Sequence, residues 1–473
     1  MSSPGAGGRH VGERAAESRR SNRGGRSAWV ALAVAVVTAA ALVCAGSAGT
    51  PITRQQPATR ASATGRVLSC PGGLSGARAR VGSVGQAPGT LSVGGKPVHG
   101  STSVDITHAA ARVQAGAPMT PHSYAVRSAT GSDWLAVAPC PEPRSNWWFV
   151  GAGGSHVHGG VLQLENPRGG RAVVGIHVLG PHGQVKAPGL QDVQVPSGHS
   201  VRLNLAKVAP AVGDLAVHVV ASRGLVSASV AEHWAPDFIT RPSSEWVPGQ
   251  PGAGRSLTLA GLTPHADKAT LLVANPSATE AVTHLSVVGR SGTFTPTSHG
   301  TVNVPPGRVV PVSLDRVLRS GPAAVRVRSQ VAVTATVRSV AGTDQDYATA
   351  SGPVGAHALA GVPRSATGAT LQLVSTASPR DKRAPVGDFL VTTYAPDGSE
   401  KTRHRLRLKP GGEQTFALKG RPAAVELTSL GRGGVGRQAV ASLALRDGNQ
   451  RAGLLPLAPT TSGTRVPTVH PGF

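Results

Sequence analysis

The segment VLQLENP, Val161 to Pro167, returns in altered form as LLVANP, Leu271 to Pro276, and this recurrence decides the fold. The two closing prolines lie 109 residues apart (276 − 167). Three landmarks that share one offset indicate a structural repeat of about 100 residues. The other two pairs are the GPHG and GRSG segments, from Gly180 and Gly289, and the VPSG and VPPG segments, from Val195 and Val304.

A third copy of the repeat is more diverged. It carries LQLVST at 371–376, APDG at 395–398 and KPGG at 409–412. Each copy is introduced by an Ala-Gly pair, and we align the pairs at 152–153, 260–261 and 360–361. The alignment predicts three related units, with residues 66–139 as a degenerate unit before them.

Within a copy, apolar and polar residues alternate. In VRLNLAKV, Val201, Leu203 and Leu205 alternate with polar residues, which is the pattern of a half-buried strand. Six or seven such strands in about 100 residues, separated by Gly, Pro and Asn turns, predict an antiparallel sandwich. We therefore expect an all-β chain of tandem immunoglobulin-like β-sandwich units, arranged as a rod and preceded by one N-terminal transmembrane helix.

The expected organisation has eight parts. They are a basic cytoplasmic tail (1–27), a transmembrane helix or signal sequence (28–47), a linker (48–65), a degenerate β unit (66–145), three β-sandwich repeats (146–246, 247–350 and 351–447) and a flexible tail (448–473).

The N-terminal region predicts export. Residues Ala28 to Ala45 form a charge-free apolar run, and six arginines but only two glutamates precede it. This asymmetry places the N-terminus in the cytoplasm and the rest of the chain outside. We expect a single-pass membrane protein, and the small residues at 46–48 allow secretion after signal cleavage as the alternative.

Two cysteines, Cys70 and Cys140, fall in the exported part. An oxidising exterior predicts a disulfide between them, with two free thiols as the alternative. Closing a loop of this length would stabilise the fold by roughly 4 kcal/mol in the loop-entropy model.

The formal net charge of +24 favours polyanionic partners. Export argues against nucleic acid, so we expect an anionic cell-wall polymer or another envelope protein as the partner. Candidate polyanion contacts are Arg403, Arg405 and Arg407 in RHRLRLK, together with Arg326 and Arg328 in AVRVRS. A strand would place the first three guanidinium groups on one face. The alternative is a charged outer face that prevents strand pairing.

Trp147 and Trp148 are candidate contacts for a glycan or a partner protein. In an extended segment they point to opposite faces, so one enters the core and the other meets solvent or the adjoining unit. An exposed indole can stack on sugar rings, and packing at a joint between units is the alternative.

Catalytic and metal-binding patterns are weak. Gly431, Gly433 and Gly436 spell G-x-G-x-x-G, but in the repeat frame they fall in a turn between strands. His156 and His158 lack a third ligand with suggestive spacing, and we interpret their segment as a solvated polar loop. The acids of GTDQDY, 342–347, lack the further ligands of a calcium loop. We expect no metal, no cofactor and no enzymatic activity.

The arrangement resembles an uncharacterised family of exported actinobacterial proteins, domain of unknown function 5719. The residues that carry the resemblance are Cys140-Pro141, the WWFVG run at 147–151, Glu165-Asn166-Pro167, and the VPSG and VPPG segments. It covers residues 66–445, and it implies neither catalytic residues nor a ligand.

The function that we expect is a non-catalytic cell-envelope scaffold or binding protein. One alternative is a glycan-binding accessory to an envelope enzyme. The other is a metal-dependent envelope enzyme that uses the region of His156 and His158.

Overall fold

The structure is a computed structural model in which the chain is all-β. It describes residues 66–82, 91–94, 96–98, 102–115, 121–128, 133–262, 266–289, 292–315, 323–381, 384–431, 435–448 and 451–459. These residues belong to one compact unit of the chain, Arg60–Thr464. The expected cytoplasmic tail, membrane segment and linker, 1–65, lie outside the described residues.

The N-terminal unit contains two four-stranded antiparallel sheets, ordered β1-β6-β3-β4 and β5-β2-β7-β8. Their strands are β1 (Arg66–Cys70), β2 (Arg78–Val81), β3 (Leu91–Val93), β4 (Lys96–Val98), β5 (Thr102–Asp105), β6 (Ala111–Ala115), β7 (His122–Arg127) and β8 (Trp134–Pro139).

Repeat 1 places β14-β10-β16-β17 in one sheet and β12-β11-β15-β9 in the other, with β13 also pairing β11. In this repeat β15 and β16 are two separate strands, and the segment between them contains Gly224, which has a positive φ of 74°. The elements are β9 (Asn146–Ala152), β10 (His158–Glu165), β11 (Ala172–Gly180), β12 (Gly183–Val185), β13 (Val193–Val195), β14 (Ser200–Asn204), α2 (Leu205–Val208), β15 (Leu215–Arg223), β16 (Ser227–Trp234) and β17 (Ser243–Val247).

In repeat 2 one long strand, β24 (Ala323–Ala341), runs through both halves and joins them into an eight-stranded sheet. Its partners are β18 (Gly254–Leu262), β19 (Lys268–Ala274), β20 (Ala281–Gly289) and β25 (Asp344–Thr349). The remaining strands are β21 (Gly292–Phe294), β22 (Thr301–Val304) and β23 (Val309–Ser313).

Repeat 3 contains the sheets β29-β28-β31-β26-β34 and β30-β27-β32-β33. The prediction of a flexible tail from residue 448 onward is wrong for its first part. Two strands after that residue, β33 and β34, belong to these sheets. The elements are β26 (His357–Gly361), β27 (Gly368–Ser375), β28 (Gly387–Tyr394), β29 (Glu400–Leu408), β30 (Glu413–Ala417), β31 (Ala424–Ser429), η1 (Val435–Gln438), β32 (Ala439–Asp447), β33 (Arg451–Pro456) and β34 (Ala458–Pro459).

Repeats 1 and 2 share a pair of side-chain hydrogen bonds. Asn166 Nδ2 donates to the carbonyls of Gly170 and Val195, at 2.7 and 3.1 Å. Asn275 Nδ2 makes the same two bonds to Thr279 and Val304, at 2.8 and 2.9 Å. Each asparagine therefore ties its own turn to the VPSG or VPPG segment, which explains why these landmarks share one offset.

The alignment of the Ala-Gly pairs needs one correction. The β-bulges that interrupt β9 and β18 fall at Gly151 and Gly261, which have φ values of +105° and +97°. Gly261 therefore corresponds to Gly151 rather than to Gly153. Alternation of apolar residues could not detect this shift, because a bulge inserts one residue into the period.

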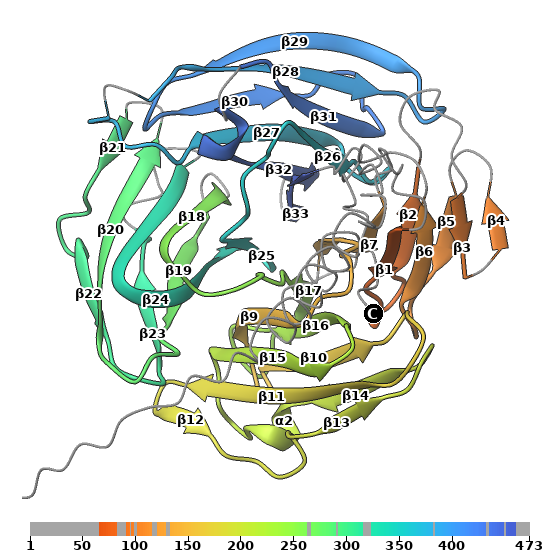
Figure 1. Ribbon diagram of the computed structural model, residues 1–473, viewed down its shortest axis with the longest axis vertical. Helices are drawn as coiled ribbons and strands as arrows, with labels where there is room; N and C mark the ends of the chain where they lie inside the picture. Colours follow the sequence, from red (N-terminus) through yellow and green to blue (C-terminus); the bar gives the residue numbers. More distant parts are fainter. Residues whose placement is uncertain are drawn as a thin grey trace, which may run out of the picture. The chain divides into compact units, whose positions relative to one another are not determined.

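The four units close on themselves rather than forming the expected rod. Each unit places one strand at the centre, namely β8, β17, β25 and β33, and Figure 1 labels the last three there. β8 contacts both β17 and β33. β25 contacts the other three central strands, so all four units meet at one centre. The sequence period defines a unit, but it contains no information on the angle between successive units.

Candidate functional site

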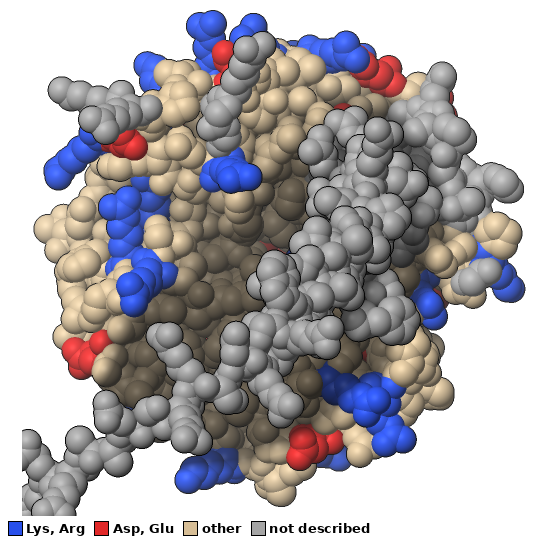
Figure 2. Space-filling view, viewed as in Figure 1, with Lys and Arg blue, Asp and Glu red and all other residues tan. Residues whose placement is uncertain are grey.

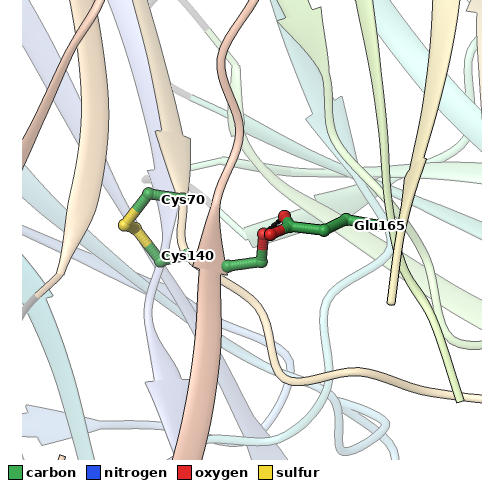
Figure 3. Close-up of a disulfide and its surroundings, with 4 residues drawn as sticks. Cys70, Cys140 and Glu165 are labelled. Atoms are coloured by element: carbon green, nitrogen blue, oxygen red, sulfur yellow. Dashed lines mark hydrogen bonds between the residues drawn. A yellow bond between two sulfur atoms is a disulfide. The ribbon is translucent and has the colours of Figure 1, made fainter. Parts of the chain in front are cut away.

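The predicted disulfide between Cys70 and Cys140 is present and joins the end of β1 to the residue after β8 (Figure 3). Beside it, the Ser69 hydroxyl donates to Glu165 at the end of β10 in repeat 1. Burial raises the pKa of Glu165, while the hydrogen bond from Ser69 opposes the rise. The disulfide thus fixes a strand that also contacts the next unit.

Both candidate tryptophans are buried, with exposed fractions of 2% for Trp147 and 4% for Trp148. Trp147 lies in the core of repeat 1, and Trp148 packs with Leu272 and Val309 of repeat 2. The expectation of opposite faces holds, and the outward face meets the adjoining unit. Neither ring is accessible to a sugar in this structure, so the tryptophans do not form a glycan platform on the folded chain.

Trp148 has an unusual partner in this joint. Its ring stacks on His218, with the centroids 3.9 Å apart. Burial lowers the pKa of His218 to about 4, and the neighbouring His177 adds to the effect. The imidazole of His218 is therefore neutral at physiological pH, and it contributes an aromatic surface rather than a charge to the joint.

The RHRLRLK segment forms the edge strand β29 of repeat 3. The side chains of Arg403, Arg405 and Arg407 are 64%, 58% and 75% exposed. Leu406 and Leu408 on the opposite face are buried in the core. Figure 2 shows basic side chains gathered over β28 and β29, at the top of the view.

Among the described residues, two carboxylates form ion pairs with these arginines. Arg403 pairs with Glu400 at 2.6 Å, whereas Arg405 and Arg407 share Asp388 at 2.9 and 3.3 Å. Hydrogen bonding to Arg405 is the main reason why the pKa of Asp388 is lowered. With Lys401 on β29 and Lys409 directly after it, cations outnumber acids along this edge of the sheet.

The other predicted arginine pair separates in the structure. Arg328 is exposed, but Arg326 is only 4% exposed and donates to the carbonyl of Ser375 in repeat 3. Burial lowers the pKa of Arg326 to about 10. Arg326 is therefore a contact between two units, and its place in a polyanion surface was wrongly predicted.

At the centre, a buried carboxylate joins three units. Asp344, the first residue of β25, accepts the backbone N–H of Leu135 from β8 at 3.1 Å and that of Ala452 from β33 at 2.8 Å. Both bonds go to Oδ2, while Oδ1 accepts the N–H of Gln345 at 2.8 Å. Asp344 thereby satisfies backbone donors of the first and last units, which a strand edge would leave unpaired.

Glu245 of β17 has a similar role between the first two units. Its Oε1 accepts the N–H of Val137 on β8 at 3.1 Å and that of Trp246 at 2.7 Å. Burial raises the pKa values of Glu245 and Asp344 well above their ordinary range, and Asp346 raises both further. Because their oxygens accept backbone hydrogen bonds, both carboxylates have a structural role.

A second buried polar network lies between repeats 1 and 2. The Glu232 carboxylate lies 3.2 Å from Nε2 of His158 and accepts a hydrogen bond from Nε2 of Gln345 at 2.9 Å. It also accepts a hydrogen bond from the hydroxyl of Tyr347. Arg338 extends from β24 to Asp214 at 2.7 Å. His158 is therefore a buried side chain in a joint between units, and its interpretation as part of a solvated loop was wrong.

The acids at the centre were not recognised as a group from the sequence. The segment of Asp344 was weighed only as a calcium loop that lacks ligands, and nothing near Glu245 indicated its backbone partner Val137, 108 positions away. Both strands carry other polar residues, β25 reading DQDYAT and β17 reading SSEWV, so no local pattern marks these acids as buried. Within the described ranges, no three His, Cys, Asp or Glu side chains are placed to hold a metal ion.

The fold and its joints define an all-β protein of four units closed around buried carboxylates. The chain belongs to a family of unknown function, DUF5719, whose model matches residues 93–419. No curated protein and no solved structure matches the chain. Among the residues that the structure describes, no helix is long and apolar enough to cross a membrane.

Proposed function

We propose that the protein is a non-catalytic binding protein of the cell envelope that holds an anionic polymer on β29. The observation that supports this proposal is the exposure of Arg403, Arg405 and Arg407 on one face of an edge strand. Guanidinium groups form paired hydrogen bonds with carboxylate and phosphate, the groups that such polymers carry. Two of the three share a single carboxylate, which leaves donor capacity for a ligand.

The same proposal includes the finer features expected from the sequence. The four units are immunoglobulin-like sandwiches that project outside the membrane, and residues 28–47 anchor them. N-terminal sequencing of the mature protein tests the anchor, because cleavage after the apolar run would make the protein secreted. A charged edge that only prevents strand pairing is the competing explanation for the arginines.

The test is retention of the full chain on immobilised heparin, used as a probe polyanion, along a salt gradient. The variant R403Q/R405Q/R407Q should elute at clearly lower salt than the wild type, because exposed charge contacts are screened by salt. The matched control is R168Q/R171Q/R223Q, which removes the same charge from exposed arginines of repeat 1. Equal shifts for the two variants would show that net charge alone explains retention, and would reject β29 as a site.

A second candidate function, contact with another envelope protein, is favoured by the loop between β16 and β17. Phe238 and Ile239 at its tip are 86% and 94% exposed. Asp237 fixes the loop by accepting the N–H groups of Ile239 and Thr240, at 2.9 and 2.6 Å. Proximity labelling with the wild type and with F238S/I239S tests this, since a partner held by the tip should disappear from the variant's labelled set.

A further inference from the structure

A groove of about 550 Å³ lies between repeat 2 and repeat 3. Gly261 and Leu262 of β18 form one side, and the sheet that contains β27 and β32 forms the other. Its size falls within the range of small-molecule sites in proteins. The groove is separate from the β29 arginines, because these lie on the other sheet of repeat 3.

At the position of the groove, one side chain differs between two related joints. LLVANP of repeat 2 corresponds to LQLVST of repeat 3, so Thr270 corresponds to Thr370. Thr270 pairs with Arg338, whereas Thr370 pairs with Ala444. In the joint between repeats 1 and 2, the long side chain of Arg338 crosses to Asp214. At the corresponding place in the joint between repeats 2 and 3, an alanine leaves the space open.

The lining has a distinct chemistry. Its floor consists largely of small side chains such as Ala417 and Ala444, and Thr370 and Thr415 add hydroxyl groups. One guanidinium, that of Arg446, lines the groove and is exposed. Among the described residues, the Arg446 side chain has no hydrogen-bond or ion-pair partner. An apolar floor beside one available cation fits a ligand with an acidic group and a short apolar part.

We propose that this groove binds a small amphipathic organic anion, with its acidic group on Arg446 and its apolar part over Ala444. The Thr370 and Thr415 hydroxyls orient the ligand. Binding here joins two units through a ligand, in the place where Arg338 and Asp214 join the preceding pair directly.

The experiment measures binding of 8-anilinonaphthalene-1-sulfonate, an aromatic anion, to the folded full chain by fluorescence titration. A444R should abolish binding at this site, because it introduces the side chain that fills the equivalent joint. R446Q should weaken binding about tenfold, as expected for loss of one charge-assisted contact. The control R437Q removes an exposed arginine of repeat 3 outside the groove and should leave the affinity unchanged.

A competition arm tests the anionic group. Hexanoate should displace the probe at a concentration at least several-fold lower than hexanol, which has the same chain without the charge. Equal potency of the two, no binding to the wild type, or equal binding to R446Q and the wild type would each overturn the proposal. If circular dichroism shows that A444R does not fold, the affinity of R446Q still tests the proposal, because this substitution alters an exposed side chain.

Discussion

Leu135 and Ala452, from the first and the last unit of the fold, donate their backbone N–H groups to the same oxygen, Oδ2 of Asp344. Both residues lie on strands at the edges of their sheets. The carboxylate of Asp344, from repeat 2, therefore accepts the hydrogen bonds that a neighbouring strand would accept if these two strands were not at sheet edges. Closure of the four units thus depends on a side chain and not only on apolar packing.

Asp344→Ala should lower the free energy of unfolding by about 3 kcal/mol. The change leaves two buried N–H groups and one partly buried N–H group without an acceptor, and relief of the buried carboxylate offsets only part of this loss. Chemical denaturation measures the effect. Glu280→Ala, which removes an exposed carboxylate of the same repeat, serves as the control and should change stability by less than about 0.5 kcal/mol.

Glu245→Gln should reduce the pH dependence of stability. Burial raises the pKa of Glu245 above its ordinary value, so the folded chain holds a proton that the unfolded chain has already lost. Unfolding then releases this proton, and stability falls as the pH rises from about 4.5 toward the raised pKa. Glutamine keeps an oxygen for the N–H groups of Val137 and Trp246 but carries no charge.

Unfolding midpoints of the wild type and of this variant, measured between about pH 5 and pH 8, check the prediction. The wild type should lose stability across this range more steeply than the variant. Parallel curves for the two proteins would contradict a raised pKa at this position.

Replacing Cys70 and Cys140 by alanine should cost about 4 kcal/mol, since the disulfide closes a loop with a sequence separation of 70. Denaturation of the wild type with and without reductant gives the same comparison without mutation. If the disulfide also secures the contact between Ser69 and Glu165, limited proteolysis should cut the double variant near β1 before any other strand. Uniform cleavage along the chain would argue against this local effect.

Gly261→Ala should destabilise the chain more than Gly292→Ala. Both glycines have a positive φ, +97° and +118°, so alanine is strained at either position. A β-carbon at Gly261 would also lie 2.4 Å from Leu454 of repeat 3, whereas one at Gly292 meets nothing within 4 Å. The difference in their thermal unfolding temperatures isolates the contact between repeats 2 and 3, and equal losses would contradict that contact.

The repeating unit could be predicted from the sequence because its signals are local. The turn that Asn166 ties to Val195 is short, and the same atoms make the same bonds around Asn275, so a constant spacing was detectable. The disulfide followed from the cysteine count together with the expectation of an oxidising exterior. Alternation within RHRLRLK correctly placed Arg403, Arg405 and Arg407 on one face of β29, and the structure buries Leu406 and Leu408 on the other.

The relations between units could not be predicted in this way. Arg326 and Arg403 occur in similar alternating segments, yet Arg326 faces repeat 3 and Arg403 faces solvent. Which face of a strand meets another unit depends on the angle at the joint. The pairing of Asp344 with β8 and β33 depends on the same angles, and no spacing in the sequence encodes it.

The most direct test of closure is an engineered cross-link between the first and last units. A β-carbon on Gly453 would lie 2.8 Å from Cγ2 of Val137, and a disulfide needs β-carbons about 3.5–4.5 Å apart. The chain carrying V137C/G453C should therefore yield a linked pair of peptides from β8 and β33 on non-reducing mass spectrometry. The control V137C/G448C, at the far end of the β32–β33 hairpin, should not. Efficient linkage only in the first variant is the predicted result, and absence of linkage in a folded chain would contradict closure of the four units.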